Sequence, residues 1–362
     1  MASTLNKKYN IKIYGSDGVT FKQTLNPGIL RNPPSFSSQL YKGLGECRLD
    51  LNLSFEDFGE GVYVDYMNIV EIYATDEINP KGRLIYKGFI SSYEPFIQGA
   101  DQGVSVILLG MISFLAFSYY KDGSSYTVSH SSEDTADIMR AIIDHFQSVY
   151  GAIITYDMVS TVNIGNSASY DFIDDKWLDA LQNAFGTIGN NDYYWNIGRD
   201  GKLYVQPKPL TAVHTFTVGK DIESLRIRKN SEKIVNDVQL RYNNTTLDGE
   251  DLISTADYGK RTAILKDDRV TILSTAQQKV DQALLTNKDP KIQASIVVNS
   301  NYDIESIQPG DTCKVRNLKK GSITLDDNML IVGVQYAWDR VTIQLSELDG
   351  KFGVELNNFI NP

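Results

Sequence analysis

Residues 48–53 read Arg-Leu-Asp-Leu-Asn-Leu, with apolar and polar side chains in strict alternation. Successive side chains of a β-strand point to opposite faces, so this pattern predicts a strand that is buried on one side. Cys47 shares the phase of the three leucines, which predicts an ordinary strand position for this thiol. The stretch therefore favours a β-sheet with one face on a core.

The residues around this stretch have the same character. Short strands are expected at residues 9–14, 63–74, 83–90 and 104–109, with Gly and Pro breakers between them. Several short strands joined by turns are typical of a small barrel or sandwich. We therefore expect a first β-barrel domain over residues 1–125.

Helical periodicity begins after residue 125. A first helix is expected over residues 132–150, with Gly151 as its C-cap. Ser131 and Ser132 are candidate N-caps, and Glu133 and Asp134 are expected as acids of the first turn. A second helix is expected after Asp174, with Trp177 in its apolar stripe. The first helix should pack on a hairpin that holds Tyr194 and Leu203. Residues 126–212 are thus expected to form an α/β insertion domain.

The remaining sequence is again rich in strand patterns. Strands are expected at residues 235–242, 292–298, 311–315, 329–336 and 341–348. One helix is expected to begin at Thr275, because Thr275 and Gln278 have the spacing of a capping box. We expect a second β-barrel domain over residues 213–350 and a C-terminal tail over 351–362. The predicted class is mainly β, with two small barrels and an α+β insertion.

Charge and cysteine content exclude several classes of protein. The 362 residues carry a formal net charge of -10, which does not suit a protein that grips nucleic acid. Cys47 and Cys313 are the only cysteines, so neither a disulfide framework nor a zinc pair is expected. The N-terminus has no signal-peptide pattern, and the longest apolar run is too short to span a membrane. The chain is expected to be made in the cytoplasm.

No catalytic motif is present. His130, His145 and His214 are not at metal-ligand spacing, and solvated positions are expected for them. Carboxylate pairs, which glycosidases require, occur in three places where Asp is also favoured for local structure: Asp174-Asp175, Asp267-Asp268 and Asp326-Asp327. We therefore predict no catalytic residue, no metal and no cofactor.

Two further clusters have a structural and a binding interpretation. Residues 193–195 are Tyr-Tyr-Trp and could stack on a sugar, although packing against the helix of Trp177 is favoured. Arg226 and Arg228 share one face of a strand. They either lie in solvent or pair with acids across a subunit interface.

The order of these elements resembles the late-control-protein-like tail hub family of phages and related contractile injection systems. The likeness rests on short stretches in sequence order: residues 86–94, 104–110, 200–203, 223–227, 234–238, 256–261, 309–311 and 332–345. A turn such as Pro309-Gly310-Asp311 is common by itself, so the order carries the resemblance. Hubs that carry cell-wall hydrolases extend further, so a lysin, spike or fibre would be a separate polypeptide.

The resemblance implies a structural hub of a phage or phage-like tail tip or baseplate. It implies a homotrimer, in which two barrels per chain form a ring of six between a hexameric tail tube and a threefold tip. Its partners would be the tail tube, distal tail or baseplate proteins, the tape measure protein and a separate spike or fibre. DNA would pass through during genome ejection without specific binding, and the chain would reside in the virion tail.

A channel for DNA should repel phosphate, so acidic residues are candidates for its wall. The candidates are Glu56, Asp57, Glu60, Asp65, Asp248, Glu250 and Asp251. The alternative for these residues is bulk solvent. The alternatives for the whole chain are a receptor- or sugar-binding tail protein and, with less support, a tail-associated cell-wall hydrolase.

Overall fold

The computed structural model describes residues 8–53, 65–75, 81–98, 101–157, 167–188, 193–317, 328–337 and 339–347. Strands predominate in it, which confirms the mainly β class with an inserted α/β part. No helix in these ranges is long and apolar enough to cross a membrane.

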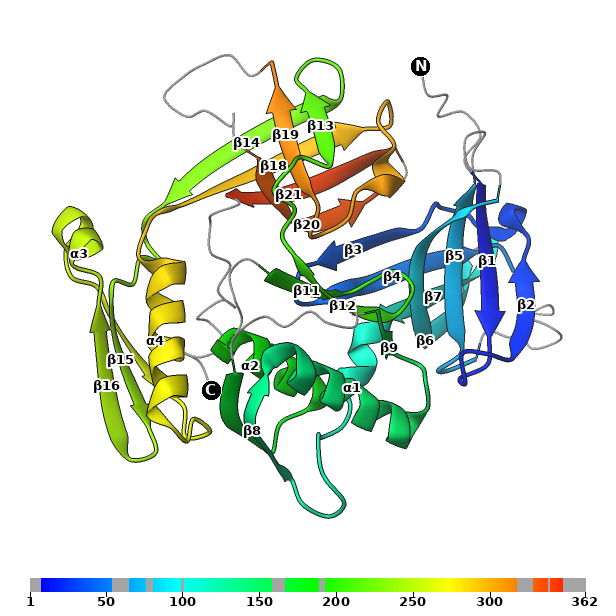
Figure 1. The fold of residues 1–362 in the computed structure, drawn as a ribbon. Helices are drawn as coiled ribbons and strands as arrows, with labels where there is room; N and C mark the ends of the chain where they lie inside the picture. The colour runs from blue at the N-terminus through cyan, green and yellow to red at the C-terminus, as the bar shows by residue number, and fades with distance from the viewer. Residues whose placement is uncertain are drawn as a thin grey trace.

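One sheet of thirteen strands passes through both β regions (Figure 1). The first region supplies β1 (Lys8–Tyr14), β2 (Phe21–Leu25), β3 (Ser35–Gln39), β4 (Gly43–Leu51), β5 (Ile69–Thr75), β6 (Arg83–Gln98) and β7 (Asp101–Gly110). The second region supplies β13 (His214–Thr217), β14 (Ile222–Asn230), β18 (Lys291–Asn299), β19 (Thr312–Arg316), β20 (Met329–Tyr336) and β21 (Arg340–Glu347).

The strands follow the order β14-β18-β21-β20-β3-β4-β7-β6-β5-β1-β2, with β13 attached through β19 to β20. Among the described residues these pairings form one open path and close neither of the two expected barrels. The expected alternation is confirmed in β4, where Cys47, Leu49 and Leu51 are buried. Cys313 is likewise a buried strand residue with a free thiol.

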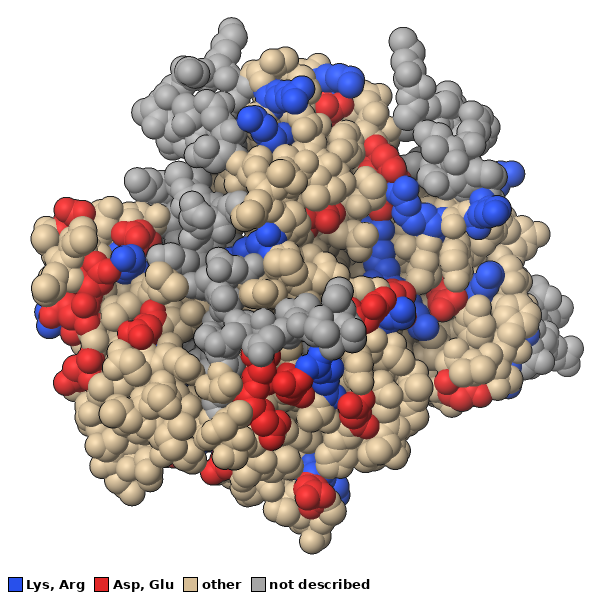
Figure 2. All heavy atoms as spheres, in the orientation of Figure 1, with Lys and Arg blue, Asp and Glu red and all other residues tan. Residues whose placement is uncertain are grey.

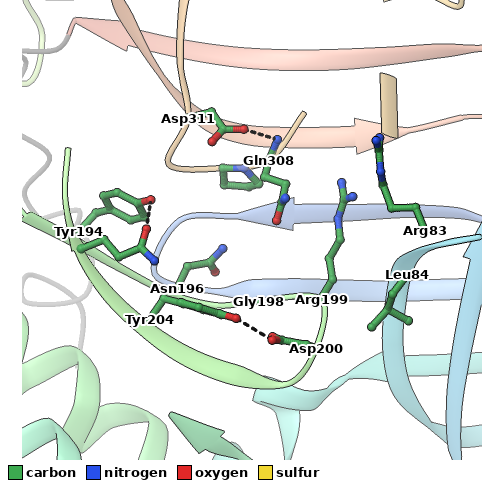
Figure 3. A pocket seen from close by; sticks show the side chains of 12 residues that line it. Arg83, Leu84, Tyr194, Asn196, Gly198, Arg199, Asp200, Tyr204, Gln308 and Asp311 are labelled. Carbon is green, nitrogen blue, oxygen red and sulfur yellow. Dashed lines mark hydrogen bonds between the residues drawn. The ribbon is translucent and has the colours of Figure 1, made fainter. Parts of the chain in front are cut away.

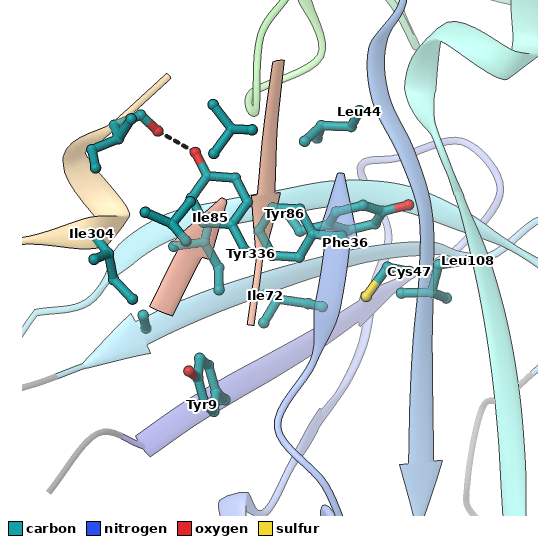
Figure 4. Close-up of a cluster of buried hydrophobic side chains, with 14 of the residues drawn as sticks. Tyr9, Phe36, Leu44, Cys47, Ile72, Ile85, Tyr86, Leu108, Ile304 and Tyr336 are labelled. Atoms are coloured by element: carbon teal, nitrogen blue, oxygen red, sulfur yellow. Dashed lines mark hydrogen bonds between the residues drawn. The ribbon is translucent and has the colours of Figure 1, made fainter. Parts of the chain in front are cut away.

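The two regions are joined where β3 pairs antiparallel with β20. Phe36 lies opposite Tyr336, with 4.6 Å between the ring centroids, and the ring of Tyr86 is 5.2 Å from that of Phe36. Figure 4 shows these rings among aliphatic side chains from both regions, such as Ile85 and Ile304. Both regions therefore share one hydrophobic core.

The α/β part lies between the two regions in sequence. Its elements are β8 (Thr127–Asp134), α1 (Thr135–Tyr150), β9 (Thr155–Tyr156), β10 (Ser167–Ile173), α2 (Trp177–Ile188), β11 (Tyr193–Ile197) and β12 (Lys202–Pro207). Strand β8 pairs with β10, and a separate sheet has the order β11-β12-β9. Short 3-10 helices occur elsewhere at Pro27–Ile29, Met111–Ala116 and Ile304–Ser306.

The first helix begins later than the sequence predicted. Asp134 is its N-cap and accepts a hydrogen bond from the backbone N–H of Ala136. Ser131, Ser132 and Glu133 belong to β8 instead, which pairs with β10 on both sides of an irregularity at Ser131 and Ser132. Gly151 ends the helix with φ of 81°, as expected.

A second, smaller α/β unit interrupts the second β region. It consists of β15 (Asp237–Tyr242), β16 (Thr245–Glu250), α3 (Leu252–Tyr258), β17 (Thr262–Lys266) and α4 (Leu273–Asn287). Its sheet has the order β16-β15-β17 and is separate from the large sheet. The expected helix cap at Thr275 is wrong. Ile272 is the N-cap of α4, and Thr275 is buried within the first turn.

The apolar stripe of α1 lies in the same buried cluster as one face of the hairpin β11–β12, and α1 also packs against α2, β8 and β9. Ile142 and Leu203 belong to the same buried cluster, which confirms that part of the expected packing. Tyr194 belongs to a different cluster, with Leu40 and Leu330, so its expected place under α1 is wrong. The period of two in a strand puts Tyr194 and Leu203 on opposite faces of the hairpin.

Replacing Ile142 by Asp should destabilise the fold by about 3–5 kcal/mol, because the carboxylate would be buried without a partner. Val149→Asp is the matched control, since Val149 lies on the same helix and is 56% exposed. Urea unfolding of both variants checks this. Equal midpoints for the two variants would contradict the burial of α1.

Candidate functional site

His130 and His145 both contact Tyr120, whereas His214 has different neighbours. His130 is buried, with Nε2 3.2 Å from the hydroxyl of Tyr120 and Nδ1 2.8 Å from Glu133. His214 is buried between the hydroxyl of Tyr302 and Oδ2 of Asp311, each 3.0 Å away. The solvated positions expected for these two residues are therefore wrong. No group of metal-ligating side chains occurs in the described ranges.

Two of the carboxylate pairs meet in space through an arginine. Arg269 Nη1 lies 2.8 Å from Asp175 Oδ1, and Arg269 Nε lies 3.1 Å from Asp267 Oδ1. The ammonium of Lys279, on α4, also pairs with Asp267. Asp174 and Asp268 do not join this cluster, and Asp326 and Asp327 lie outside the described residues.

The charges in this cluster compensate one another. Burial alone raises the pKa of Asp267, but Lys279 and Arg269 outweigh it and hold this pKa below its usual value. Burial raises the pKa of Asp175, against the charge of Arg269, and lowers the pKa of Lys279. The cluster joins the start of α2 to the β15–α4 unit. Its geometry is that of a buried structural ion pair and not of two carboxylates facing a substrate.

The hairpin β11–β12 has two different faces. One face buries apolar side chains in the core under the helices, namely Trp195, Ile197, Leu203 and Val205. The core interpretation of the Tyr-Tyr-Trp cluster is thus confirmed for Trp195. The opposite face presents polar and aromatic side chains in two cross-strand pairs, Tyr194 with Gln206 and Asn196 with Tyr204.

This opposite face is the floor of a cleft of about 410 Å³ (Figure 3). The start of β6, with Arg83, forms one wall, and the turn at residues 308–311 forms another. Gly310 is required in this turn. Its φ is 98°, and a Cβ there would lie 2.4 Å from the ring of Tyr194.

Arg199, at the tip of the hairpin, fastens the floor to the second β region. Its guanidinium donates to the carbonyl oxygens of Glu305 and Ile307, at 2.5 and 2.9 Å, and to the hydroxyl of Tyr336. It also lies 5.0 Å from the centre of the Tyr336 ring. The cleft is therefore held by the same tyrosine that joins β3 to β20.

The charged groups of the cleft already have partners. Arg83 Nη1 is 2.9 Å from both oxygens of Asp303, and Asp200 accepts from Tyr204 at 2.6 Å. Burial raises the pKa of Tyr204, and burial with the charge of Asp311 raises the pKa of Tyr194 to about 12. Both hydroxyls thus stay protonated at neutral pH. The arrangement offers hydrogen bonds and ring surface, without an activated nucleophile.

The candidate acids of the channel wall fall in two places. Asp65 is exposed beside Tyr66, whereas Asp248, Glu250 and Asp251 lie on β16 and at the start of α3. Figure 2 shows acidic side chains gathered over that second place. Glu250 pairs with Lys260, and Asp251 caps α3 and pairs with Lys288. Glu56, Asp57 and Glu60 lie outside the described residues.

Arg226 and Arg228 are exposed on β14, on the same face, which agrees with the sequence pattern. Arg228 is 3.8 Å from Glu232.

The cleft was not predicted from the sequence. The available signal was the alternation of Tyr194 and Asn196 with Trp195 and Ile197, which predicts a second, more polar face.

Comparisons with known proteins give matches in structure alone. No protein-family model and no curated sequence matches the chain. The 43 kDa tail protein of prophage MuSo2 from Shewanella oneidensis has a TM-score of 0.65 at 11% identity, covering 96% of this chain and 100% of that protein. A tail protein from Neisseria meningitidis MC58 has a TM-score of 0.66 at 12% identity, with coverages of 96% and 98%.

A more distant match is a component of the type VI secretion system of E. coli, described as structurally similar to phage T4 tail proteins. Its TM-score is 0.50 at 11% identity, covering 93% of this chain and 75% of that protein. At these identities the likeness concerns the fold. The fold that the sequence resemblance implied, that of phage tail proteins, is confirmed over nearly the whole chain.

Replacing Asp267 by Asn should cost about 3–5 kcal/mol at neutral pH, because Lys279 and Arg269 would lose a buried counter-charge. The pKa of Asp267 is lowered in the folded state, so its contribution is present above the unfolded pKa, near ~4, and is lost as pH falls through the folded pKa. The difference from wild type in urea unfolding should therefore shrink in acid.

Asp268→Asn is the control, because the Asp268 side chain is 65% exposed and pairs with a surface lysine, Lys266. It should change the free energy of unfolding by less than about 1 kcal/mol. A cost for Asp267→Asn that is as small, or that does not vary with pH, would argue against the ionic cluster.

Proposed function

We propose that this chain is a structural hub of a phage or phage-like tail tip or baseplate. The observation that carries the proposal is the fold likeness to tail proteins over 96% of the chain. A second support is the fusion of two β regions into one sheet at β3–β20. A chain built in this way presents two β regions in a fixed mutual orientation.

The proposed assembly is a homotrimer. Three chains supply six β regions, which suits a junction between a sixfold tail tube and a threefold tip. The open path of the large sheet ends at β14 and β2, and such strand edges can pair with a neighbouring chain. The exposed Arg226 and Arg228 on β14 would then lie near a subunit boundary.

The role proposed for the chain is structural and not enzymatic. In the described ranges the buried carboxylates Asp175 and Asp267 are paired with cations, and the histidines are bonded to tyrosine or carboxylate or packed in an aromatic cluster. The proposed partners are the tail tube, distal tail or baseplate proteins, the tape measure protein and a separate spike or fibre. The proposed location is the virion tail, with DNA passing along the trimer axis during genome ejection.

Assembled particles test the copy number directly. Three copies around the tail axis are expected in electron microscopy images of the tail tip, with the chain identified by its fold. A single copy, or copies placed off the axis, would overturn the hub proposal. The state of the isolated chain is a weaker test, because assembly can depend on the neighbouring proteins.

The charge of the channel wall is tested by reversing it. In assembled particles, Asp65→Lys with Asp248→Lys should slow DNA ejection, because lysine attracts phosphate where the acids repel it. The effect should be larger at low salt than at high salt, since ions screen the attraction.

Asp65→Asn with Asp248→Asn is the matched control and should have a smaller effect at every salt concentration. Ejection rates that are the same for wild type, the lysine pair and the asparagine pair would show that these acids do not face the DNA path.

A further inference from the structure

Asn196 differs from the other polar side chains of the cleft in its burial and in its hydrogen bonding. Its side chain is more than nine-tenths buried, and Figure 3 shows it directed into the cleft between β11 and the turn at 308–311. Its Oδ1 has no hydrogen-bond partner in the part of the chain that the structure describes. A buried amide oxygen without a partner is costly, so a ligand that donates to it would recover that free energy.

The surroundings of Asn196 indicate the chemistry of such a ligand. The floor combines the ring of Tyr204 with side-chain amides, and Gln308 faces it from the opposite wall. The lining charges compensate one another. Arg83 and Arg199 are bonded to Asp303 and to backbone carbonyls, and the carboxylates accept from tyrosine, histidine and backbone groups. A charged ligand would find no unpaired charge here, which favours a neutral one.

A sugar fits this arrangement better than a peptide does. A pyranose has an apolar face of C–H groups for an aromatic ring and hydroxyl or acetamido donors at its edge for amide oxygens. The floor is the face of a hairpin whose strands already pair with each other, so it offers no ladder to an extended peptide. The volume of about 410 Å³ lies within the range of small-molecule clefts.

We propose that the cleft between β6, the hairpin β11–β12 and the turn at 308–311 binds a short neutral saccharide, with Asn196 Oδ1 as its central acceptor. This site is independent of the proposed trimer, because all its walls come from one chain. Binding would attach the tail protein to a glycan without requiring catalysis.

Titration calorimetry of the full chain with N,N′-diacetylchitobiose and with cellobiose tests the proposal. At least one disaccharide should bind saturably with one site per chain. Asn196→Leu should weaken that binding about tenfold or more, the loss expected when a buried hydrogen bond is removed. No saturable binding of either sugar, or unchanged affinity in the variant, would overturn the proposal.

Thermal unfolding separates loss of binding from loss of folding. Asn196→Leu should keep or raise the melting temperature, because the replaced oxygen makes no hydrogen bond to any residue that the structure describes. Asn236→Leu is the contrast, since Asn236 bonds Ser254, Gly259 and Arg261, and its melting temperature should fall. If acetyl-trialanine amide binds the cleft in an Asn196-dependent way and the sugars do not, the site takes a peptide and the saccharide proposal is wrong.

Discussion

The rest of the fold depends on the antiparallel pairing of β3 with β20, two strands from opposite ends of the chain. Bringing β3 and β20 together closes nearly the whole chain into a loop, which costs conformational entropy. The backbone hydrogen bonds between the four paired residues of each strand offset little of this cost. The larger compensation is the shared core, in which Phe36 packs on Tyr86 and Tyr336. The α/β part, which lies between the two regions in sequence, is attached to this junction by Arg199. The guanidinium of Arg199 donates hydrogen bonds to the hydroxyl of Tyr336 and to the carbonyl oxygen of Ile307.

A second junction is ionic and fixes a different boundary. Asp175 at the start of α2 and Asp267 after β17 share Arg269, and Lys279 from α4 completes the cluster. Apolar side chains pack in many alternative ways, whereas buried charges require their partners at hydrogen-bond distance. The β15–α4 unit is therefore placed against the α/β insertion by specific pairing as well as by the apolar contacts of its sheet and helix. The aromatic junction between β3 and β20 and the ionic cluster around Arg269 thus fix how the small local elements pack together.

The sequence predicted those features that depend on local periodicity. Alternation located β1, β4, β15 and β20, and helical spacing located α1 and α2. Features that arise from distant contacts were not predictable in this way. Pairing of β8 with β10 moved the start of α1 past Ser132, and burial removed Thr275 from a capping role. Asp175 and Asp267 looked like separate local turns, because nothing in either segment indicates that one arginine binds both. Alternation could indicate the polar face of the hairpin but not the cleft, since the cleft walls come from β6, the hairpin and residues 308–311.

The floor of the cleft, the hairpin β11–β12, is held rigid by packing on both of its faces. Trp195 and Ile197 are fixed in the core under the helices, and the strand period then fixes Tyr194 and Asn196 on the opposite face. A shift of the cleft floor would have to move the core residues as well, and repacking a close-packed core is costly. The floor is also held from the other side, by Gly310 against Tyr194 and by Arg199 against Tyr336. Asn196 is consequently held in place by its neighbours although its oxygen has no partner among them. A ligand would therefore meet a preorganised floor, for which little ordering entropy remains to be lost on binding.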